Sequence, residues 1–205
     1  MKRIAIFMTA LAILATGCSK GQKFTLESDL ASAHFDPKTE SLVLESDVLS
    51  EPVTIPVNDG KFSYSGKVEK PAVATLKGVG GKASAPMFVL EKGAITFQDG
   101  LACGTRLNDD ASEFLRSIRE IPKKHPGDRA ATTEEAVQAV RKYVSDHAKD
   151  PSAILALSIA RRFASAEEMV KLIESTSPAV QNDSHVQLMK VVMKNRKPRS
   201  AADSE

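Results

Sequence analysis

Hydrophobic residues in the first half of the chain recur in short runs that are rich in β-branched and aromatic side chains. Runs of this kind, bounded by turn residues, are typical of β-strands. Asn58-Asp59-Gly60 separates two of the runs and tolerates the positive φ of a tight hairpin turn, and Glu91-Lys92-Gly93 separates two others. Because no helical pattern intervenes, we expect an antiparallel β-sandwich over residues 23–106. The predicted strands are residues 42–44, 53–57, 61–65, 72–76, 87–90 and 94–97.

From Asn108 onwards the apolar positions take the spacing of about 3.6 residues that marks helices. We expect Pro122 to end the first helix, because proline cannot donate the next backbone hydrogen bond. Thr132 and Ser165 are each followed by a glutamate at capping-box spacing, which predicts two helix starts. Asp150 before Pro151 predicts a third, with the proline at the first helical position.

The two patterns together predict an α+β chain in which the β-sandwich is followed by a small helical-hairpin domain over residues 107–196. The last helix is expected at about 184–195, and residues 197–205 are expected to form a disordered tail. Basic residues at this end either contact anionic lipid headgroups or simply complement the C-terminus of a helix. They are Lys190, Lys194, Arg196, Lys197 and Arg199.

An apolar run with a basic start precedes the predicted strands. Lys2 and Arg3 are followed by an apolar run over residues 4–14 and then by Ala15-Thr16-Gly17-Cys18. A basic start, an apolar middle and a small-residue end form an export signal that is removed from the mature protein. The run is shorter than the roughly 20 apolar residues that cross a bilayer as a helix. We therefore predict a signal peptide over residues 1–17.

The small residues before Cys18 resemble the lipobox of bacterial lipoproteins, with Ala15 where leucine is usual. The resemblance implies cleavage between Gly17 and Cys18, a diacylglycerol thioether on Cys18, and a lipidated tether over residues 18–22. Two or three acyl chains are enough for stable membrane anchoring. The alternative is ordinary cleavage that leaves a soluble periplasmic protein. By analogy with lipoprotein sorting, Ser19 favours the periplasmic face of the outer membrane.

Charge and cysteine content narrow the possible partners. The chain has 28 basic and 26 acidic residues, and removal of Lys2 and Arg3 leaves a formally neutral mature protein. No nucleic-acid partner is indicated by this balance. If Cys18 is lipidated, Cys103 is left alone and no structural disulfide is expected. Leu101-Ala102-Cys103-Gly104 reads as the end of a strand, so we expect a buried or half-buried thiol rather than a reactive one.

The sequence does not match the motifs of phosphate-binding loops, serine hydrolases or metal sites. The glycine-rich stretch from Gly78 to Ala83 would need glycine at Leu76 and Ser or Thr at Ala83 to be a phosphate-binding loop, so we expect a hairpin loop. No Gly-x-Ser-x-Gly elbow occurs. The histidines lack metal-ligand spacing and are expected at the solvated surface, so no metal or cofactor is predicted. They are His34, His125, His147 and His185.

A larger set of motifs resembles the β-rich N-terminal domain of many Bacteroidetes thiol-disulfide oxidoreductase lipoproteins, domain of unknown function 4369. Its pattern is a DGKF hairpin, a following proline, a strand pair with the letters LE, G and I, and a closing GT-x-x-N before a helix. The matching residues here are 58–68, Pro71, 88–97, Gly104-Thr105 and Asn108.

In that family a helical segment leads to a C-terminal thioredoxin-like domain of the AhpC/TSA or TlpA type, whose Cys-x-x-Cys performs disulfide exchange. This sequence has no Cys-x-x-Cys and ends where that domain would begin. We therefore expect the resemblance to imply the fold and the lipid anchor, but not the catalysis.

These observations predict a lipid-anchored binding or interaction module of the cell envelope that has no catalytic activity of its own. The alternative is an accessory subunit that docks in trans onto a separate periplasmic thioredoxin-like protein. A third possibility is a decayed oxidoreductase that has lost its catalytic domain. No residue pattern identifies a ligand or an oligomeric state.

Overall fold

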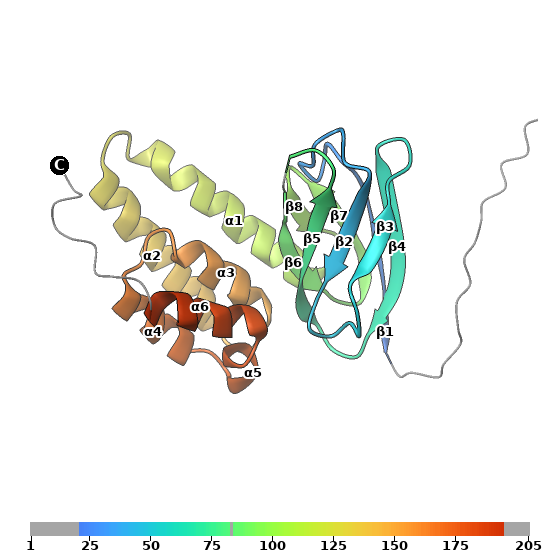
Figure 1. Ribbon diagram of the computed structural model, residues 1–205. Helices are drawn as coiled ribbons and strands as arrows, with labels where there is room; N and C mark the ends of the chain where they lie inside the picture. The colour runs from blue at the N-terminus through green and yellow to red at the C-terminus, as the bar shows by residue number, and fades with distance from the viewer. Residues whose placement is uncertain (1–20, 83, 195–205) are drawn as a thin grey trace, which may run out of the picture.

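The structure, a computed structural model, describes residues 21–82 and 84–194, which form eight strands followed by six helices (Figure 1). The α+β class predicted from the sequence is therefore confirmed. The predicted signal peptide, Cys18 and the predicted disordered tail lie outside the described residues. No helix within the described ranges combines the length and the apolar character that a membrane crossing requires.

The first sheet has four strands in the order β4-β1-β7-β8. The strands are β1 (Gln22–Asp29), β4 (Lys61–Val68), β7 (Gly93–Gln98) and β8 (Leu101–Cys103). β1 pairs antiparallel with β4 but parallel with β7, so the prediction of a purely antiparallel arrangement is wrong. The physical reason is that the chain builds a second sheet between β1 and β7, and such a long crossover allows it to return in the same direction.

The second sheet has the order β3-β2-β5-β6, with every neighbouring pair antiparallel. Its strands are β2 (Ser41–Glu45), β3 (Val53–Pro56), β5 (Ala72–Val79) and β6 (Met87–Leu90). Side chains from both sheets form one hydrophobic core, because alternate residues of a strand point to the same face. Phe24 and Ile95 of the first sheet and Leu44 and Leu76 of the second are examples of fully buried members.

The turn at Asp59 and Gly60 is the tight two-residue turn that the sequence predicts. Both residues have positive φ, 51° and 71°, and Asn58 and Lys61 exchange two backbone hydrogen bonds of 2.8 and 2.9 Å. The strands on either side, however, belong to different sheets, because β3 pairs with β2 and β4 pairs with β1. The predicted turn is confirmed, and the predicted hairpin pairing is wrong.

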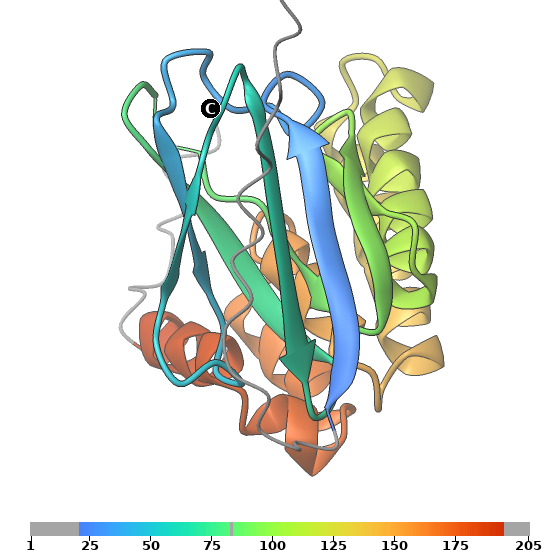
Figure 2. The same ribbon diagram turned by 90° about the vertical axis from the view of Figure 1, so that its right-hand side faces the viewer.

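The helices lie on one side of the two sheets (Figure 1, Figure 2). They are α1 (Arg106–Lys124), α2 (Arg129–Asp146), α3 (Ser152–Ala160), α4 (Ala166–Glu174), α5 (Pro178–Gln181) and α6 (Ser184–Lys194). Their buried side chains form a second hydrophobic core that also includes Val73 of β5 and Val89 of β6. The second sheet therefore contributes to both cores, one on each of its faces.

Local capping chemistry explains where the helices begin. Ser165 caps α4 as predicted, and its hydroxyl accepts a hydrogen bond from the Glu168 amide. α2 begins before the predicted start at Thr132, because the Asp128 carboxylate accepts from the Ala131 amide and caps the helix. The predicted N-cap at Asp150 is also displaced, since α3 starts at Ser152.

Two further differences concern proline. Pro122 lies inside α1, which continues to Lys124, so the predicted end of this helix is wrong. Ile118 and Ile121 are both buried in the helical core, and their packing holds the last turn in helical form despite the missing N–H. The short helix α5 was not predicted, although Ser177 before Pro178 is a start signal of the same kind.

Candidate functional site

Helix α6 carries apolar side chains on two opposite faces. Val186, Met189 and Met193 are buried in the helical core. Leu188, Val191 and Val192 follow the i, i+3, i+4 spacing of a second stripe and are 63%, 54% and 39% exposed. A second apolar face is typical of a helix that is covered on both sides, yet only one face of α6 is covered in the described residues.

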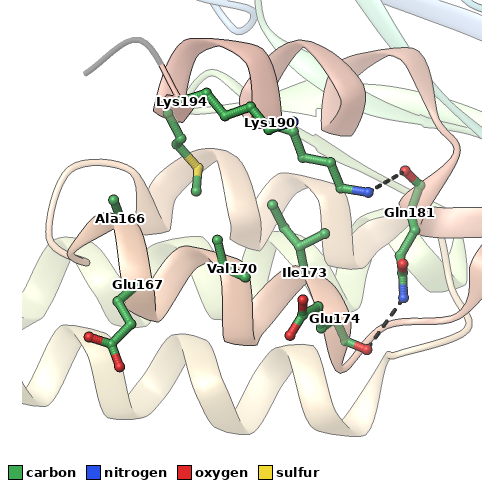
Figure 3. Close-up of a pocket in the computed structure, with 9 residues that line it drawn as sticks. Ala166, Glu167, Val170, Ile173, Glu174, Gln181, Lys190 and Lys194 are labelled. Atoms are coloured by element: carbon green, nitrogen blue, oxygen red, sulfur yellow. Dashed lines mark hydrogen bonds between the residues drawn. The ribbon is translucent and has the colours of Figure 1, made fainter. Parts of the chain in front are cut away.

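A groove of about 470 Å³ lies beside this helix, between α4, α5 and α6 (Figure 3). Its apolar lining includes Val170, which is 45% exposed, and the buried Ile173 and Met193. Leu188, Val191 and Val192 do not line the groove. Val191 is one helical turn from Lys194 at its edge, whereas Leu188 and Val192 lie on the far side of α6. We call the surface formed by the groove and by Val170, Leu188, Val191 and Val192 the α4–α6 face.

The two long walls of the groove carry opposite charges. Glu167 and Glu174 stand on α4, whereas Lys190 and Lys194 stand on α6 (Figure 3). Glu167 pairs with Lys171 at 2.7 Å, and the hydrogen bond from Lys171 lowers the pKa of the Glu167 carboxyl. Glu174, Lys190 and Lys194 make no ion pair with any residue in the described ranges.

Gln181 of α5 closes one end of the groove. Its side-chain amide donates to the carbonyl oxygens of Glu174 at 3.3 Å and Thr176 at 2.8 Å. The backbone carbonyl oxygen of Gln181 accepts from the Lys190 ammonium group at 3.5 Å (Figure 3). These bonds join α4, α5 and α6 and fix the width of the groove at this end.

The start of α6 is held by the loop after β2. The Asp47 carboxylate accepts from the Ser184 amide at 3.1 Å and from its hydroxyl at 2.8 Å. An acidic group at a helix N-terminus satisfies free amides and complements the helix dipole. Next to it, the hydrogen bond with Asp183 raises the pKa of His185, and the charges of Asp47 and Glu45 act in the same direction.

Residues of the LE and GT-x-x-N motifs contact one another where β6 meets the start of α1, which we call the joint. The buried Glu91 carboxylate accepts from the Leu107 and Asn108 amides at 2.7 and 3.2 Å, and so caps α1. The Asn108 side chain accepts from the Val89 amide at 2.9 Å and donates to the Val89 carbonyl at 2.8 Å. It also donates to the Thr105 hydroxyl at 2.8 Å. The Asn108 side chain thus makes the two hydrogen bonds to the β6 backbone that a neighbouring strand would make.

Two glycines make the same joint possible. Gly93 has φ 125°, and a Cβ there would lie 2.9 Å from Cγ2 of Thr105. Gly104 has φ 92°, and a Cβ there would lie 2.5 Å from the Ala94 carbonyl oxygen. Both positions have positive φ and leave no room for a Cβ, a combination that only glycine permits without strain. These motif residues therefore have a structural role in this chain.

The other residues singled out in the sequence are scattered over the fold. Cys103 is half-buried, as expected, and the Arg116 guanidinium lies 3.5 Å from its sulfur. The sequence did not indicate this contact, because Arg116 lies within α1, 13 residues after Cys103. Gly78 and Val79 are the last residues of β5, and Gly80 to Lys82 begin the connection to β6. Because β5 and β6 pair antiparallel, the predicted hairpin loop is confirmed.

Each histidine lies beside a carboxylate, and three of the four are partly rather than fully exposed. The partners are Asp99 for His34, Glu135 for His125, Asp150 for His147 and Asp183 for His185. The side chains of the last three are only 31%, 19% and 26% exposed. The structure does not bring the histidines together, and no cluster of three or more His, Cys, Asp or Glu suited to a metal occurs in the part of the chain that it describes.

Comparison of the chain with protein-family models, with curated proteins and with solved structures found no match. The resemblance to domain of unknown function 4369 therefore stays a prediction.

Proposed function

We propose that this chain is a lipid-anchored binding or interaction module of the cell envelope, without catalytic activity of its own, and that the α4–α6 face is its binding surface. The observation that carries the proposal is the exposed apolar stripe of α6, a helix that also forms one wall of a groove with an apolar floor. Contiguous exposed apolar surface rimmed by charged residues is typical of interaction sites. A groove of this volume also falls within the range of ligand sites, roughly 300 to 1,000 Å³.

The anchor is proposed from the sequence. The basic start, the apolar run and the residues Ala15-Thr16-Gly17-Cys18 support cleavage after Gly17 and acylation of Cys18. Acylated in this way, the folded part is attached to a membrane through its N-terminus, and we place it at the periplasmic face of the outer membrane. Such an anchor leaves the α4–α6 face available to partners in the periplasm.

We further propose that the two sheets form a β-sandwich, that the helices form a helical-hairpin domain, and that the chain is related to domain of unknown function 4369. The shared core between the sheets supports the first point. The third point is supported by the joint between β6 and α1, where residues that are spaced apart in the motif contact one another. These residues are Glu91, Gly93, Gly104, Thr105 and Asn108.

The alternative function is an accessory subunit that docks in trans onto a periplasmic thioredoxin-like protein. The observation that favours it is the position of the α4–α6 face on the last described helix. In the family that the sequence resembles, the thioredoxin-like domain follows this helical segment. A separate protein of that class would then occupy the corresponding place.

The experiment is cross-linking in living cells, followed by affinity capture of the tagged full chain and mass spectrometry. The intact mass of the N-terminal peptide is measured in the same sample. We expect a diacylated Cys18 and a captured protein whose recovery falls in Val191→Ser but not in Val79→Ser, which alters a similarly exposed valine on β5. Capture of a thioredoxin-like protein selects the alternative, and equal capture by both variants contradicts the proposed surface.

A further inference from the structure

A second groove, separate from the α4–α6 face, lies where the sheets meet α1 and α3. Its volume is about 350 Å³, and it shares no lining residue with the groove beside α6. Its walls come from the start of β6, the turn between β7 and β8, the middle of α1, and α3 with the residues just after it. Large apolar side chains from these elements line it, among them Met87, Leu115, Ile118, Leu155, Ile159 and Phe163.

This apolar lining is only partly covered by the fold. Ile118 and Leu155 are buried, whereas Leu115, Ile159 and Phe163 pack against the helical core and remain half-exposed. A concave, mainly apolar surface with few polar groups is typical of small-ligand sites, whose volumes run from roughly 300 to 1,000 Å³. The groove therefore has the size and the lining of a site for a small ligand.

The polar groups that line the groove are basic or neutral. They are Arg119, Arg162 and Ser158, and no carboxylate stands among the described residues that line it. Arg162 is exposed and makes no ion pair within the part of the chain that the structure describes. Arg119 pairs with Asp99 at 3.4 Å, but both side chains are well exposed, at 47% and 67%, and such a surface pair contributes little to stability.

These groups complement an anion that carries an apolar chain. A guanidinium group presents a planar fork of donors that matches a carboxylate, and Arg162 has its fork free. The Ser158 hydroxyl donates only to the Met87 sulfur at 3.7 Å, a weak acceptor that a ligand oxygen can replace. A ligand of this kind would place its chain on the apolar lining and its carboxylate beside Arg162.

An anionic membrane surface fits the groove less well. Protein segments that recognise such surfaces usually cluster roughly four to eight basic residues. Arg119 and Arg162 are the basic residues that line this groove, and Arg119 is already paired. The charge therefore suits a single carboxylate rather than an array of headgroups.

We propose that this groove binds a small amphipathic carboxylate of the medium-chain fatty acid class, with Arg162 as the main partner of the carboxylate. Arg119 and Ser158 provide further donors beside it. The inference goes beyond the interaction role of the α4–α6 face and does not depend on it, because the two grooves are separate.

Isothermal titration calorimetry of the whole mature chain tests this site. Residues 18–205 are produced without the signal peptide in detergent-free buffer, so that no acyl chain or micelle competes for the groove. Acetate, hexanoate and octanoate are titrated separately. We expect the affinity to rise about fourfold with each added methylene, the gain that follows from burying one. Octanol, which lacks the carboxylate, should bind about tenfold more weakly than octanoate.

Two adjacent arginines provide a matched comparison. Arg162→Gln should weaken octanoate binding about tenfold, because the carboxylate loses a charge-assisted hydrogen bond. Arg161→Gln removes the same charge from an exposed residue that does not line the groove, and should leave the affinity within about twofold of wild type. Ile159→Ser should weaken octanoate binding more than acetate binding, and thermal unfolding checks that this variant is folded.

Three results would overturn the proposal. They are the absence of saturable octanoate binding, an equal loss in Arg161→Gln and Arg162→Gln, and octanol binding as tightly as octanoate. Each is distinguishable from failure of the proposed function, because Val191→Ser alters the α4–α6 face and should leave octanoate affinity unchanged.

Discussion

Asp47 caps helix α6 through Ser184, although the two residues are 137 positions apart in the sequence. The bond fixes the helix that carries the α4–α6 face to the loop after β2. The position of the proposed binding surface therefore depends on the sheets as well as on the helical core. A rigid connection of this kind favours binding, because less conformational entropy is lost when a partner docks.

The first prediction concerns the effect of removing this cap. We expect Asp47→Ala to lower the free energy of unfolding by about 0.5 to 2 kcal/mol, the usual cost of a lost helix cap. Hydrogen exchange should rise at the first amides of α6, because they lose their acceptor. Glu51→Ala, an exposed acidic residue in the same loop, is the control and should leave both quantities unchanged. A loss of stability equal in both variants would contradict the capping role.

The second prediction concerns Asn108. We expect Asn108→Ala to destabilise the protein by about 2 to 4 kcal/mol, because the amide and carbonyl of Val89 lose buried partners. Urea unfolding measures the change. Glu113→Ala on the exposed side of α1 should change stability by no more than about 0.5 kcal/mol. If Asn108→Ala behaves like this control, the joint between β6 and α1 does not hold the two parts together.

The third prediction compares two glycines that share positive φ. Gly104 and Gly60 have φ 92° and 71°, but a Cβ at Gly104 meets a backbone oxygen at 2.5 Å whereas one at Gly60 meets nothing within 4 Å. Gly60→Ala should therefore cost only the left-handed conformation, about 1 to 2 kcal/mol. Gly104→Ala should cost clearly more, because the backbone must also shift. Thermal unfolding of the two variants under the same conditions decides the order, and a reversed order would contradict the account of the joint.

The fourth prediction is a pH dependence. Because the Asp183 carboxylate raises the pKa of His185 in the folded protein, the charged imidazole stabilises the fold. The contribution is complete below the unfolded pKa of about 6.5 and is lost as the pH rises through the higher folded pKa. The stability difference between wild type and His185→Gln should thus be larger at about pH 5.5 than at about pH 8.5. A difference independent of pH would exclude this coupling, and His34→Gln, at the most exposed histidine, is the control.

The sequence predicts best those features that a few adjacent residues determine. The turn at Asp59 and Gly60 follows from residues that tolerate positive φ, and the start of α4 follows from the Ser165 hydroxyl. The pairing of β3 and β4 with different sheets could not be predicted in this way, because it depends on how distant strands share the core. The same holds for Pro122, whose effect on α1 is outweighed by the burial of Ile118 and Ile121.

The candidate site was predictable only in part. The sequence of α6 shows apolar residues on two faces, but whether Leu188, Val191 and Val192 are covered depends on elements far away in the chain. The groove was also hidden in the sequence, since it needs Gln181 of the unpredicted α5 to close its end. The sequence motif singled out Glu91 and Asn108. Only the structure shows that Glu91 caps α1 and that Asn108 hydrogen-bonds to the backbone of β6.

The central claim is that the α4–α6 face is the binding surface of this module, and site-specific photo-cross-linking in living cells tests it most directly. A photoreactive amino acid is placed at Leu188 on the exposed stripe of α6 and, in a second strain, at Val79 on β5. We predict a discrete cross-linked protein adduct from position 188 and none from position 79. No adduct from position 188, or the same adduct from both positions, would contradict the claim.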